Sequence, residues 1–281
     1  MIGIALIPAA GKGTRMLPNT RAYPKELVEF GEKPVIEWVL NGLEEAGIRQ
    51  VLLIVGHKKG ALIDYVGDGR VFGLEANYIF QEEAKGLGHA VLSGHTVIEE
   101  DYSDFIVCFG DNIIQPSREI SNLIALHEQH EPLATVMTFK TQTPERYGVV
   151  KVNRSGGNGT LEITDICEKP QTAEEQGPFE FEGSWQAVSS VLAFNTRIFD
   201  YLRKTKPGRG GEIQVTDAIG LGIQSGEKVL AYPLQGSFID IGGWDFLRHQ
   251  HHYFASMSEE ELDRIIADRN RIMERLKDKE S

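Results

Sequence analysis

The chain opens with the apolar run Ile2-Gly-Ile-Ala-Leu-Ile7 and continues directly into Pro8-Ala-Ala-Gly-Lys-Gly-Thr-Arg-Met-Leu-Pro-Asn-Thr-Arg-Ala-Tyr-Pro-Lys-Glu-Leu27. The apolar run is typical of a buried parallel strand. Gly11 and Gly13 allow the backbone to turn sharply and approach a ligand, since neither residue carries a Cβ. Backbone N–H groups in such a turn can bind an anion. The order of strand and glycine-rich turn therefore predicts a phosphate-binding loop.

Positive charge is concentrated in this loop. Four cations precede Glu26, the first acidic residue of the chain: Lys12, Arg15, Arg21 and Lys25. The whole chain carries a net charge of −12, which argues against a nucleic-acid surface and makes the local cluster more informative. An ordinary βα loop with surface lysines is the alternative, but such loops rarely exclude every carboxylate. We therefore predict a polyphosphate site.

Two known phosphate motifs are excluded by spacing. A Walker A loop needs four residues between its first glycine and Gly-Lys-Ser/Thr, whereas Lys12 is followed by Gly13. A dinucleotide fingerprint needs a third glycine where this chain has Met16. The loop is thus of another kind.

The motif Gly11-Lys-Gly-Thr-Arg15, followed by Pro18 and Pro24-Lys-Glu-Leu27, resembles the signature of the sugar-1-phosphate nucleotidyltransferases. These enzymes are the nucleoside-diphosphate-sugar pyrophosphorylases, and their uridylyl and thymidylyl branches are the most similar. Further motifs recur in family order to about residue 245. The resemblance implies that Arg15 and Lys25 are catalytic and stabilise charge on a nucleoside triphosphate. It also implies a nucleotide-binding set in the loop: Ala10, Gly11, Gly13 and Thr14.

Strands and helices alternate through the first half of the chain. Helices are predicted at 34–46, 61–66 and 90–98, and strands at 50–55, 76–80 and 104–109. This alternation predicts an α/β fold with a doubly wound, mostly parallel, Rossmann-like sheet flanked by helices. A hairpin is predicted from 149–152 and 160–167, an exposed loop at 171–184, and a strand at 186–194.

We expect residues 1–255 to form the nucleotidyltransferase domain. Its nucleotide part would span about 1–140 and an inserted β-rich sugar-binding part about 141–245. Residues 256–281 are predicted to form a C-terminal amphipathic helix, because Ser258 and Glu261 make a capping box. Its apolar residues recur at helical spacing: Leu262, Ile265, Ile266, Ile272, Met273 and Leu276.

Two aspartates stand at predicted strand ends. Asp111 lies in Phe109-Gly-Asp-Asn112, and Asp240 lies in Phe238-Ile-Asp-Ile-Gly-Gly243. Mg²⁺ is usually held by one or two carboxylates together with phosphate oxygens and water. A simple turn is the alternative reading of Gly-Asp-Asn. The family resemblance implies that Asp111 and Asp240 hold Mg²⁺, with Asp111 also counted as catalytic.

A possible base-reading segment runs from Gln81 to Ala90. A glutamine amide can both donate to and accept from a pyrimidine edge, and glycines let the backbone approach a base. Gly-Leu-Gly before a helix is also a common turn. The segment Glu83-Ala-Lys-Gly-Leu-Gly-His-Ala-Val91 resembles the base-binding segment of glucose-1-phosphate uridylyltransferases. That resemblance implies that Gln81 and Gly86 bind uracil or thymine.

The segments Pro144-Glu-Arg-Tyr-Gly-Val-Val150 and Cys167-Glu-Lys-Pro170 resemble the sugar-phosphate segments of the family. The resemblance implies that Gly148 and Glu168 bind sugar hydroxyls and that Lys169 is catalytic and neutralises the sugar phosphate. An exposed charge pair is the alternative for Glu168-Lys169. The segment 211–217 is expected to help build the sugar pocket.

One position departs from the family pattern. Where the family usually has a glycine facing the sugar, this chain reads Ala187-Val-Ser-Ser-Val191. We expect Ser190 to add a hydroxyl and bulk to the sugar-binding site, which leaves the identity of the sugar open.

The implied reaction is nucleotidyl transfer, in which a sugar 1-phosphate attacks the α-phosphorus of a pyrimidine nucleoside triphosphate and pyrophosphate leaves. UTP is favoured narrowly over dTTP, with glucose 1-phosphate as the default sugar; a glucose-1-phosphate thymidylyltransferase is the alternative. Two other classes are alternatives: a regulatory relative that binds nucleotide sugars without catalysis, and a nicotinamide-dependent oxidoreductase.

Composition sets further limits. The 281 residues suffice for one large domain with an appendage. No apolar run reaches the roughly 20 residues of a membrane span, and no signal peptide is apparent because a strand begins at residue 2. Cys108 and Cys167 lie in apolar runs, as expected in a reducing cytoplasm. His127-Glu-Gln-His130 is too short for a zinc-protease motif and is expected on a helix face. Relatives often form dimers or tetramers, so a homo-oligomer is expected by analogy.

Overall fold

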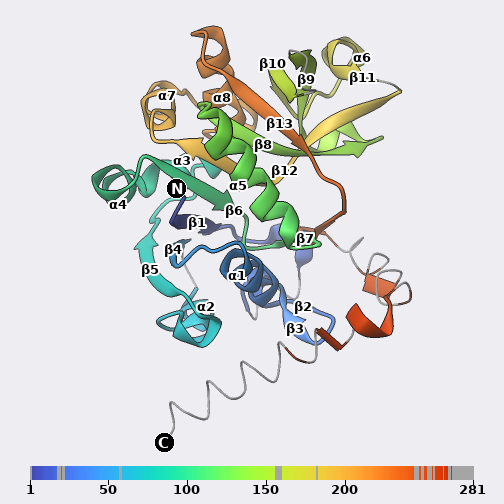
Figure 1. Ribbon diagram of the computed structural model, residues 1–281. Helices are drawn as coiled ribbons and strands as arrows, with labels where there is room; N and C mark the ends of the chain where they lie inside the picture. Colours follow the sequence, from blue (N-terminus) through green and yellow to red (C-terminus); the bar gives the residue numbers. More distant parts are fainter. Residues whose placement is uncertain are drawn as a thin grey trace, which may run out of the picture.

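The computed structural model describes residues 2–243 except 18–19, 21–22, 57–58, 156–159 and 182, together with positions 247, 250, 251, 255, 257–261, 263, 264 and 267. Its centre is a ten-stranded sheet in the order β5-β4-β1-β6-β12-β8-β13-β10-β9, with β11 paired to β12 (Figure 1). The strands of this sheet are β1 (Ile4–Ala9), β4 (Gln50–Val55), β5 (Glu75–Phe80), β6 (Asp104–Cys108), β8 (Ala134–Thr141), β9 (Gly148–Ser155), β10 (Thr160–Glu168), β11 (Glu180–Phe181), β12 (Ser184–Asn195) and β13 (Val229–Pro233).

The sheet has two differently built halves. Strands β5, β4, β1 and β6 are parallel neighbours, as the alternation of strands and helices predicted. Beyond β6, strand β12 runs antiparallel to both β6 and β8. Among the strands described in this half, the β13–β8 pair alone is parallel. The predicted hairpin is present as the antiparallel pair β9–β10, although its turn at 156–159 lies outside the described residues.

Helices cover both faces of the sheet (Figure 1). They are α1 (Val35–Glu45), α2 (Gly60–Val66), α3 (Leu87–Ser93), α4 (His95–Asp101), α5 (Arg118–His130), α6 (Ala173–Gln176), α7 (Ile198–Lys204) and α8 (Val215–Gln224). One core joins the sheet to α1, α2 and α5, and the other joins it to α3, α4, α7 and α8. Alternate residues of β1 enter the two cores, Ala5 and Ile7 the first and Ile4 and Leu6 the second. A strand covered on both faces must be apolar throughout, which explains the opening run of the sequence.

Short elements complete the fold. Two small sheets pair β2 (Glu29–Phe30) with β3 (Lys33–Pro34) and β7 (Asn112–Gln115) with β14 (Ser237–Asp240). The 3₁₀ turns are η1 (Thr14–Met16), η3 (Lys25–Leu27), η4 (Arg70–Phe72), η5 (Pro144–Arg146), η6 (Gly177–Phe179) and η7 (Arg209–Gly211).

Two predicted elements were wrong in detail. The single helix expected at 90–98 is divided into α3 and α4 at Gly94, where a Cβ would lie 2.6 Å from the Leu6 side chain. The loop expected at 171–184 contains α6, η6 and β11. Trp185 on β12 donates from its indole nitrogen to the Gln176 carbonyl at 3.0 Å, so this segment is tied to the sheet.

Two smaller predictions are confirmed. The capping box is formed, since the Glu261 N–H donates to Ser258 Oγ at 3.3 Å and the Ser258 N–H donates to Glu261 Oε2 at 2.9 Å. The apolar residues of the predicted C-terminal helix lie outside the described residues: Leu262, Ile265, Ile266, Ile272, Met273 and Leu276. His127 lies on α5, buried beside Thr135 and Asp104.

Among the described residues, none of the helices is long and apolar enough to cross a membrane.

Candidate active site

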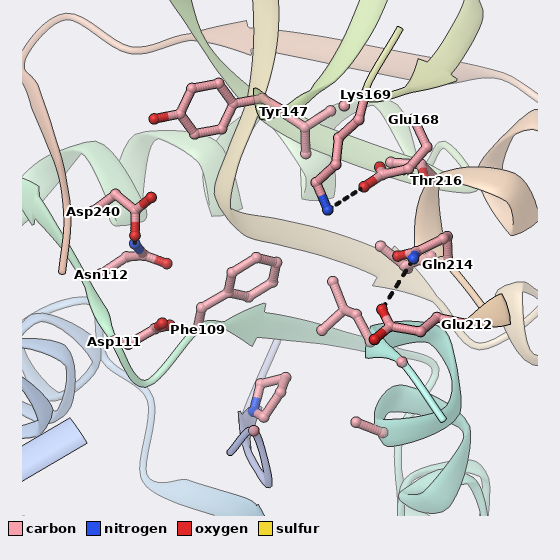
Figure 2. A pocket seen from close by; sticks show the side chains of 18 of the residues that line it. Phe109, Asp111, Asn112, Tyr147, Glu168, Lys169, Glu212, Gln214, Thr216 and Asp240 are labelled. Carbon is pink, nitrogen blue, oxygen red and sulfur yellow. Dashed lines mark hydrogen bonds and ion pairs between the residues drawn. The ribbon is translucent and has the colours of Figure 1, made fainter. Parts of the chain in front are cut away.

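A cavity of about 870 Å³ lies where the two halves of the sheet meet, at the carboxyl ends of β1 and β6. Open α/β sheets bind ligands at this edge, where strand order reverses. In Figure 2, Asp111, Asn112 and Asp240 lie on one side of the cavity, and Glu168, Lys169 and Thr216 lie on the other. Several segments contribute residues to the cavity lining, although not every residue of a segment reaches it. They are 8–15, 25, 81–90, 109–112, 145–148, 168–169, 188–189, 212–216, 238 and 240.

The glycine-rich loop follows β1 and forms one wall. Gly13 has φ 63°, and a Cβ there would lie 2.8 Å from Thr20 Cγ2, so both the backbone conformation and the space require glycine. Thr20 Oγ1 donates to the Gly13 carbonyl at 2.7 Å and fixes the turn. The predicted nucleotide-binding residues of the loop, with the two predicted catalytic cations, all line the cavity: Ala10, Gly11, Gly13, Thr14, Arg15 and Lys25. Pro18 and Arg21 lie outside the described residues.

Lys25, on η3, forms a close ion pair with Asp111, which follows β6. The Lys25 side chain is 19% exposed and that of Asp111 only 10%. Burial alone lowers the pKa of Lys25, but the carboxylates of Asp111, Glu26 and Asp240 outweigh it, and the net pKa is raised. Lys25 is therefore a fixed positive charge at neutral pH.

A second, fully buried ion pair supports the first. Lys59 Nζ donates to Glu26 Oε2 at 2.6 Å, and the Glu26 side chain is completely buried. Burial raises the pKa of Glu26, against the opposing attraction of Lys59 and Lys25. Reasoning from the sequence missed Lys59, which has no motif around it and lies 33 residues from its partner.

Asp240 reaches the cavity through the small β14–β7 sheet, whose register pairs it with Asn112. Asn112 Nδ2 donates to Asp240 Oδ1 at 3.1 Å, and the Gly242 N–H donates to the same oxygen at 2.7 Å. Asp111 has one oxygen bound by Lys25. Within the described residues no donor reaches the second oxygen of either carboxylate. Two such oxygens beside a phosphate loop suit a divalent cation that takes its remaining ligands from phosphate and water.

The described residues contain no group of three or more His, Cys, Asp or Glu side chains that could hold a metal by themselves. Arg15 stands close to Asp240, because a Cβ on Gly242 would lie 2.7 Å from Arg15 Nη2 and 2.8 Å from Asp240 Oδ1. The arrangement thus combines two carboxylates with two cations on the phosphate side of the cavity.

Gln81 and Gly86 form another part of the wall, between β5 and α3. Gly86 has φ 102°, and a Cβ there would lie 2.6 Å from the Ile213 carbonyl oxygen. Gly88 N–H donates to that carbonyl at 2.8 Å, and the Ile213 N–H donates to the Lys85 carbonyl at 2.8 Å. The Gly-Leu-Gly segment is therefore held against the start of α8 and leaves the backbone of Gly86 open to the cavity.

The opposite wall carries Gly148, Glu168 and Lys169. Lys169 Nζ lies 3.0 Å from Glu168 Oε1, and Thr216 Oγ1 donates to Glu168 Oε2 at 2.9 Å (Figure 2). The Lys169 side chain is 45% exposed, so its charge is far less enclosed than that of Lys25. The expectation that 211–217 borders this region agrees with the placement of Thr216, although its contact with Glu168 was not foreseen.

The expectation for Ser190 was wrong. Ser190 does not line the cavity; its neighbour Ser189 does. Ser190 is 2% exposed, and its carbonyl accepts from the Phe109 N–H at 3.0 Å within the sheet. The pairing of β12 with β8 shifts register between Val188 and Leu192, so simple alternation does not hold across the two serines.

The chain matches the family model described as nucleotidyl transferase over residues 4–256 and therefore belongs to that family. A UTP–glucose-1-phosphate uridylyltransferase of Bacillus subtilis (strain 168) is 33% identical over 263 residues, which cover 85% of this chain and 86% of that one. A glucose-1-phosphate thymidylyltransferase of Streptomyces antibioticus is 32% identical over 239 residues, covering 85% and 62%.

Solved structures of UDP-glucose pyrophosphorylases are also similar to this chain. A UDP-glucose pyrophosphorylase complexed with UDP-glucose has a TM-score of 0.79 at 27% identity and covers 92% of this chain and 100% of its own. The UTP-bound enzyme from Acinetobacter baumannii has a TM-score of 0.75 at 28% identity, covering 95% and 99%. The matches confirm the predicted α/β fold and the resemblance to sugar-1-phosphate nucleotidyltransferases.

Proposed function

We propose that this chain joins a sugar 1-phosphate to a pyrimidine nucleoside triphosphate and releases pyrophosphate, with UTP and glucose 1-phosphate as the preferred substrates. The observation that carries the proposal is the meeting of two cationic sites in one cavity. The glycine loop with Lys25 and Arg15 stands on one wall, and Lys169 with Glu168 stands on the other. A reaction between two phosphorylated substrates needs such a pair of sites.

Catalysis would rest on positioning and on charge stabilisation, as in other phosphoryl transfers. Lys25 and Arg15 would neutralise charge that develops on the triphosphate as pyrophosphate leaves. Lys169 would hold the phosphate of the sugar 1-phosphate in line with the α-phosphorus. Glu168 and the backbone of Gly148 would bind sugar hydroxyls. Because no protein nucleophile takes part, one phosphoanhydride bond breaks as the new one forms.

We propose Mg²⁺ as the cofactor, held by Asp111 and Asp240, whose carboxylates both line the cavity. Bound there, Mg²⁺ would offset the negative charge of the phosphates. Lys25 would orient Asp111, while Asn112 and the Gly242 N–H would orient Asp240.

The preference for UTP is supported by relatives named as uridylyltransferases at 30–33% identity. The thymidylyltransferase relative at 32% identity supports dTTP as a second nucleotide. The two bases differ by one methyl group, which a pocket distinguishes by only about 1–3 kcal/mol. We therefore expect activity with both nucleotides. The regulatory alternative is disfavoured, because the cavity retains all five of the charged groups that catalysis would use: Arg15, Lys25, Asp111, Lys169 and Asp240.

We further propose a cytoplasmic homo-oligomer, in which residues 1–255 form the catalytic domain and 256–281 an additional helix. The nucleotide part would end near residue 140. By that point the chain has formed every strand of the parallel half of the sheet, of which β6 is the last. The division into a nucleotide part and a sugar-binding part follows the expected role of each part of the cavity wall. The homo-oligomer is proposed by analogy with relatives, and the cytoplasm from the low number of cysteines.

Pyrophosphate release with Mg²⁺ tests the proposal directly. UTP, dTTP, CTP, ATP and GTP would each be combined with glucose 1-phosphate and with N-acetylglucosamine 1-phosphate. We expect release that requires both substrates and is fastest with UTP and glucose 1-phosphate. Silence with every pair would contradict the proposal; if UTP still raised the melting temperature, the regulatory function would replace it.

A further inference from the structure

Gln81 makes one side-chain hydrogen bond that bears on base recognition. The residue follows β5, is 5% exposed, and its backbone N–H donates to the Val55 carbonyl at 2.7 Å. Its side-chain Nε2 lies 2.5 Å from Nδ1 of His89, in the first turn of α3. Among the described residues no other side chain forms a hydrogen bond with the Gln81 amide. Its remaining hydrogen-bonding capacity therefore faces the cavity.

The direction of that hydrogen bond determines what the amide offers to a ligand. A neutral imidazole that accepts at Nδ1 binds the amide nitrogen, which leaves Oε1 and the second N–H hydrogen for the ligand. Uracil and thymine donate at N3 and accept at the adjacent carbonyls, so they match this pair. Cytosine accepts at N3 and donates from its amino group, so it matches only the amide rotated by 180°.

His89 is held where it can impose this choice. The Gly88 N–H donates to the Ile213 carbonyl, which anchors the first turn of α3 to the segment before α8, and Ser93 Oγ donates to the His89 carbonyl at 2.8 Å within the helix. The charged groups near the ring are Lys85 and Glu83, which pair with each other at 2.6 Å. Burial, followed by Lys85, lowers the pKa of His89, and Glu83 opposes the shift. The neutral ring is thus favoured.

We propose that His89 is a positioning residue that sets base selectivity. By accepting from Gln81 Nε2, it holds the amide with Oε1 toward the ligand, which selects pyrimidines that donate at N3 and rejects cytosine. The inference rests on the proposed function, because it assumes that Gln81 binds the base. It goes further in assigning the selectivity to a residue that need not touch the nucleotide.

The test compares kcat/KM for UTP and CTP in the wild type, in His89→Leu and in His89→Asp. Leucine removes the acceptor, whereas aspartate keeps an acceptor that cannot donate. We expect the UTP-to-CTP ratio to fall by roughly 10-fold or more in His89→Leu, because the amide can then rotate. It should stay within about threefold of the wild type in His89→Asp, where only an acceptor faces Gln81. The ratio cancels any general loss of activity.

An unchanged ratio in His89→Leu, or an equal loss in both variants, would overturn the inference. If the wild type shows no turnover, the proposed function fails, and dissociation constants for UTP and CTP in the same three proteins still test the role of His89. A ¹⁵N–¹H spectrum of the wild type gives a readout that needs no active variant, with the His89 signals assigned by their absence from His89→Asp. Protonation at Nε2 alone is expected, and a proton on Nδ1 would contradict the inference.

Discussion

Lys25 and Lys169 stand on opposite walls of the cavity, and each pairs with a carboxylate, but their surroundings differ. Lys25 lies 19% exposed against Asp111, with the buried Lys59–Glu26 pair behind it. Lys169 lies 45% exposed against Glu168, and its backbone is in the left-handed region at φ 46°. The first lysine is enclosed by neighbouring charges and protein, whereas the second is largely open to solvent. An enclosed charge can stabilise the transition state without much reorganisation of the groups around it. An exposed charge is screened by solvent and mainly attracts and orients its ligand.

The largest effect is expected from breaking the buried pair behind Lys25. Lys59→Met leaves the Glu26 carboxylate buried without its principal partner, and we expect the free energy of unfolding to fall by about 3–5 kcal/mol. Urea denaturation measures this loss. The matched control is Lys169→Met, which removes an exposed lysine from a glutamate and should lower stability by about 1 kcal/mol or less. Equal losses in the two variants would show that the two walls do not differ as described.

The next effect concerns turnover. Lys25→Ala removes a preorganised positive charge, and Asp111→Ala removes its partner and a proposed metal ligand. We expect kcat to fall by roughly 10²-fold or more in each variant. Pyrophosphate release at saturating substrates measures the change. Lys206→Ala is the control, since Lys206 is an exposed lysine that is not among the residues lining the cavity. Near wild-type turnover in Lys25→Ala would remove that residue from the mechanism.

The arrangement of the fold was predictable because its causes are local. Apolar runs covered on both faces identify β1, β4 and β6, and the glycines at 11 and 13 follow β1 directly. The charged residues of the cavity lie beside recognisable turns, so their motifs identified them. Lys59 could not be found in this way, because it meets Glu26 only through the packing of the chain.

Ser189 and Ser190 show a different limit. Assigning one of two adjacent serines to the cavity requires the register of β12, and that register shifts between Val188 and Leu192. If alternate residues are counted from Val188, which lines the cavity, Ser190 is expected to line it as well. The structure instead has Ser189 in the cavity lining. Gly94 is similar, since the division between α3 and α4 coincides with the close approach of Leu6, which belongs to a distant part of the sequence.

On the sugar wall, a change at Lys169 should act on binding more than on turnover. For Lys169→Ala we expect the KM for the sugar 1-phosphate to rise roughly 10-fold while kcat changes less, because an exposed charge mainly attracts its ligand. The difference from wild type should shrink as salt is added. Lys169→Arg keeps the charge and serves as the control. A fall confined to kcat would mean that Lys169, like Lys25, acts in the transition state.

The smallest effect tests how Glu168 is positioned on the wall that carries Lys169. Thr216 is 4% exposed and donates from Oγ1 to Glu168 Oε2, so it orients the carboxylate that carries Lys169 on its other oxygen. Thr216→Val keeps the shape but removes the donor, which should weaken sugar binding by about 1 kcal/mol, or about fivefold in KM. Thr216→Ser retains the hydroxyl and should bind as the wild type does. Weakening in both variants would attribute the effect to packing, and Glu168 would then be positioned by Lys169 alone.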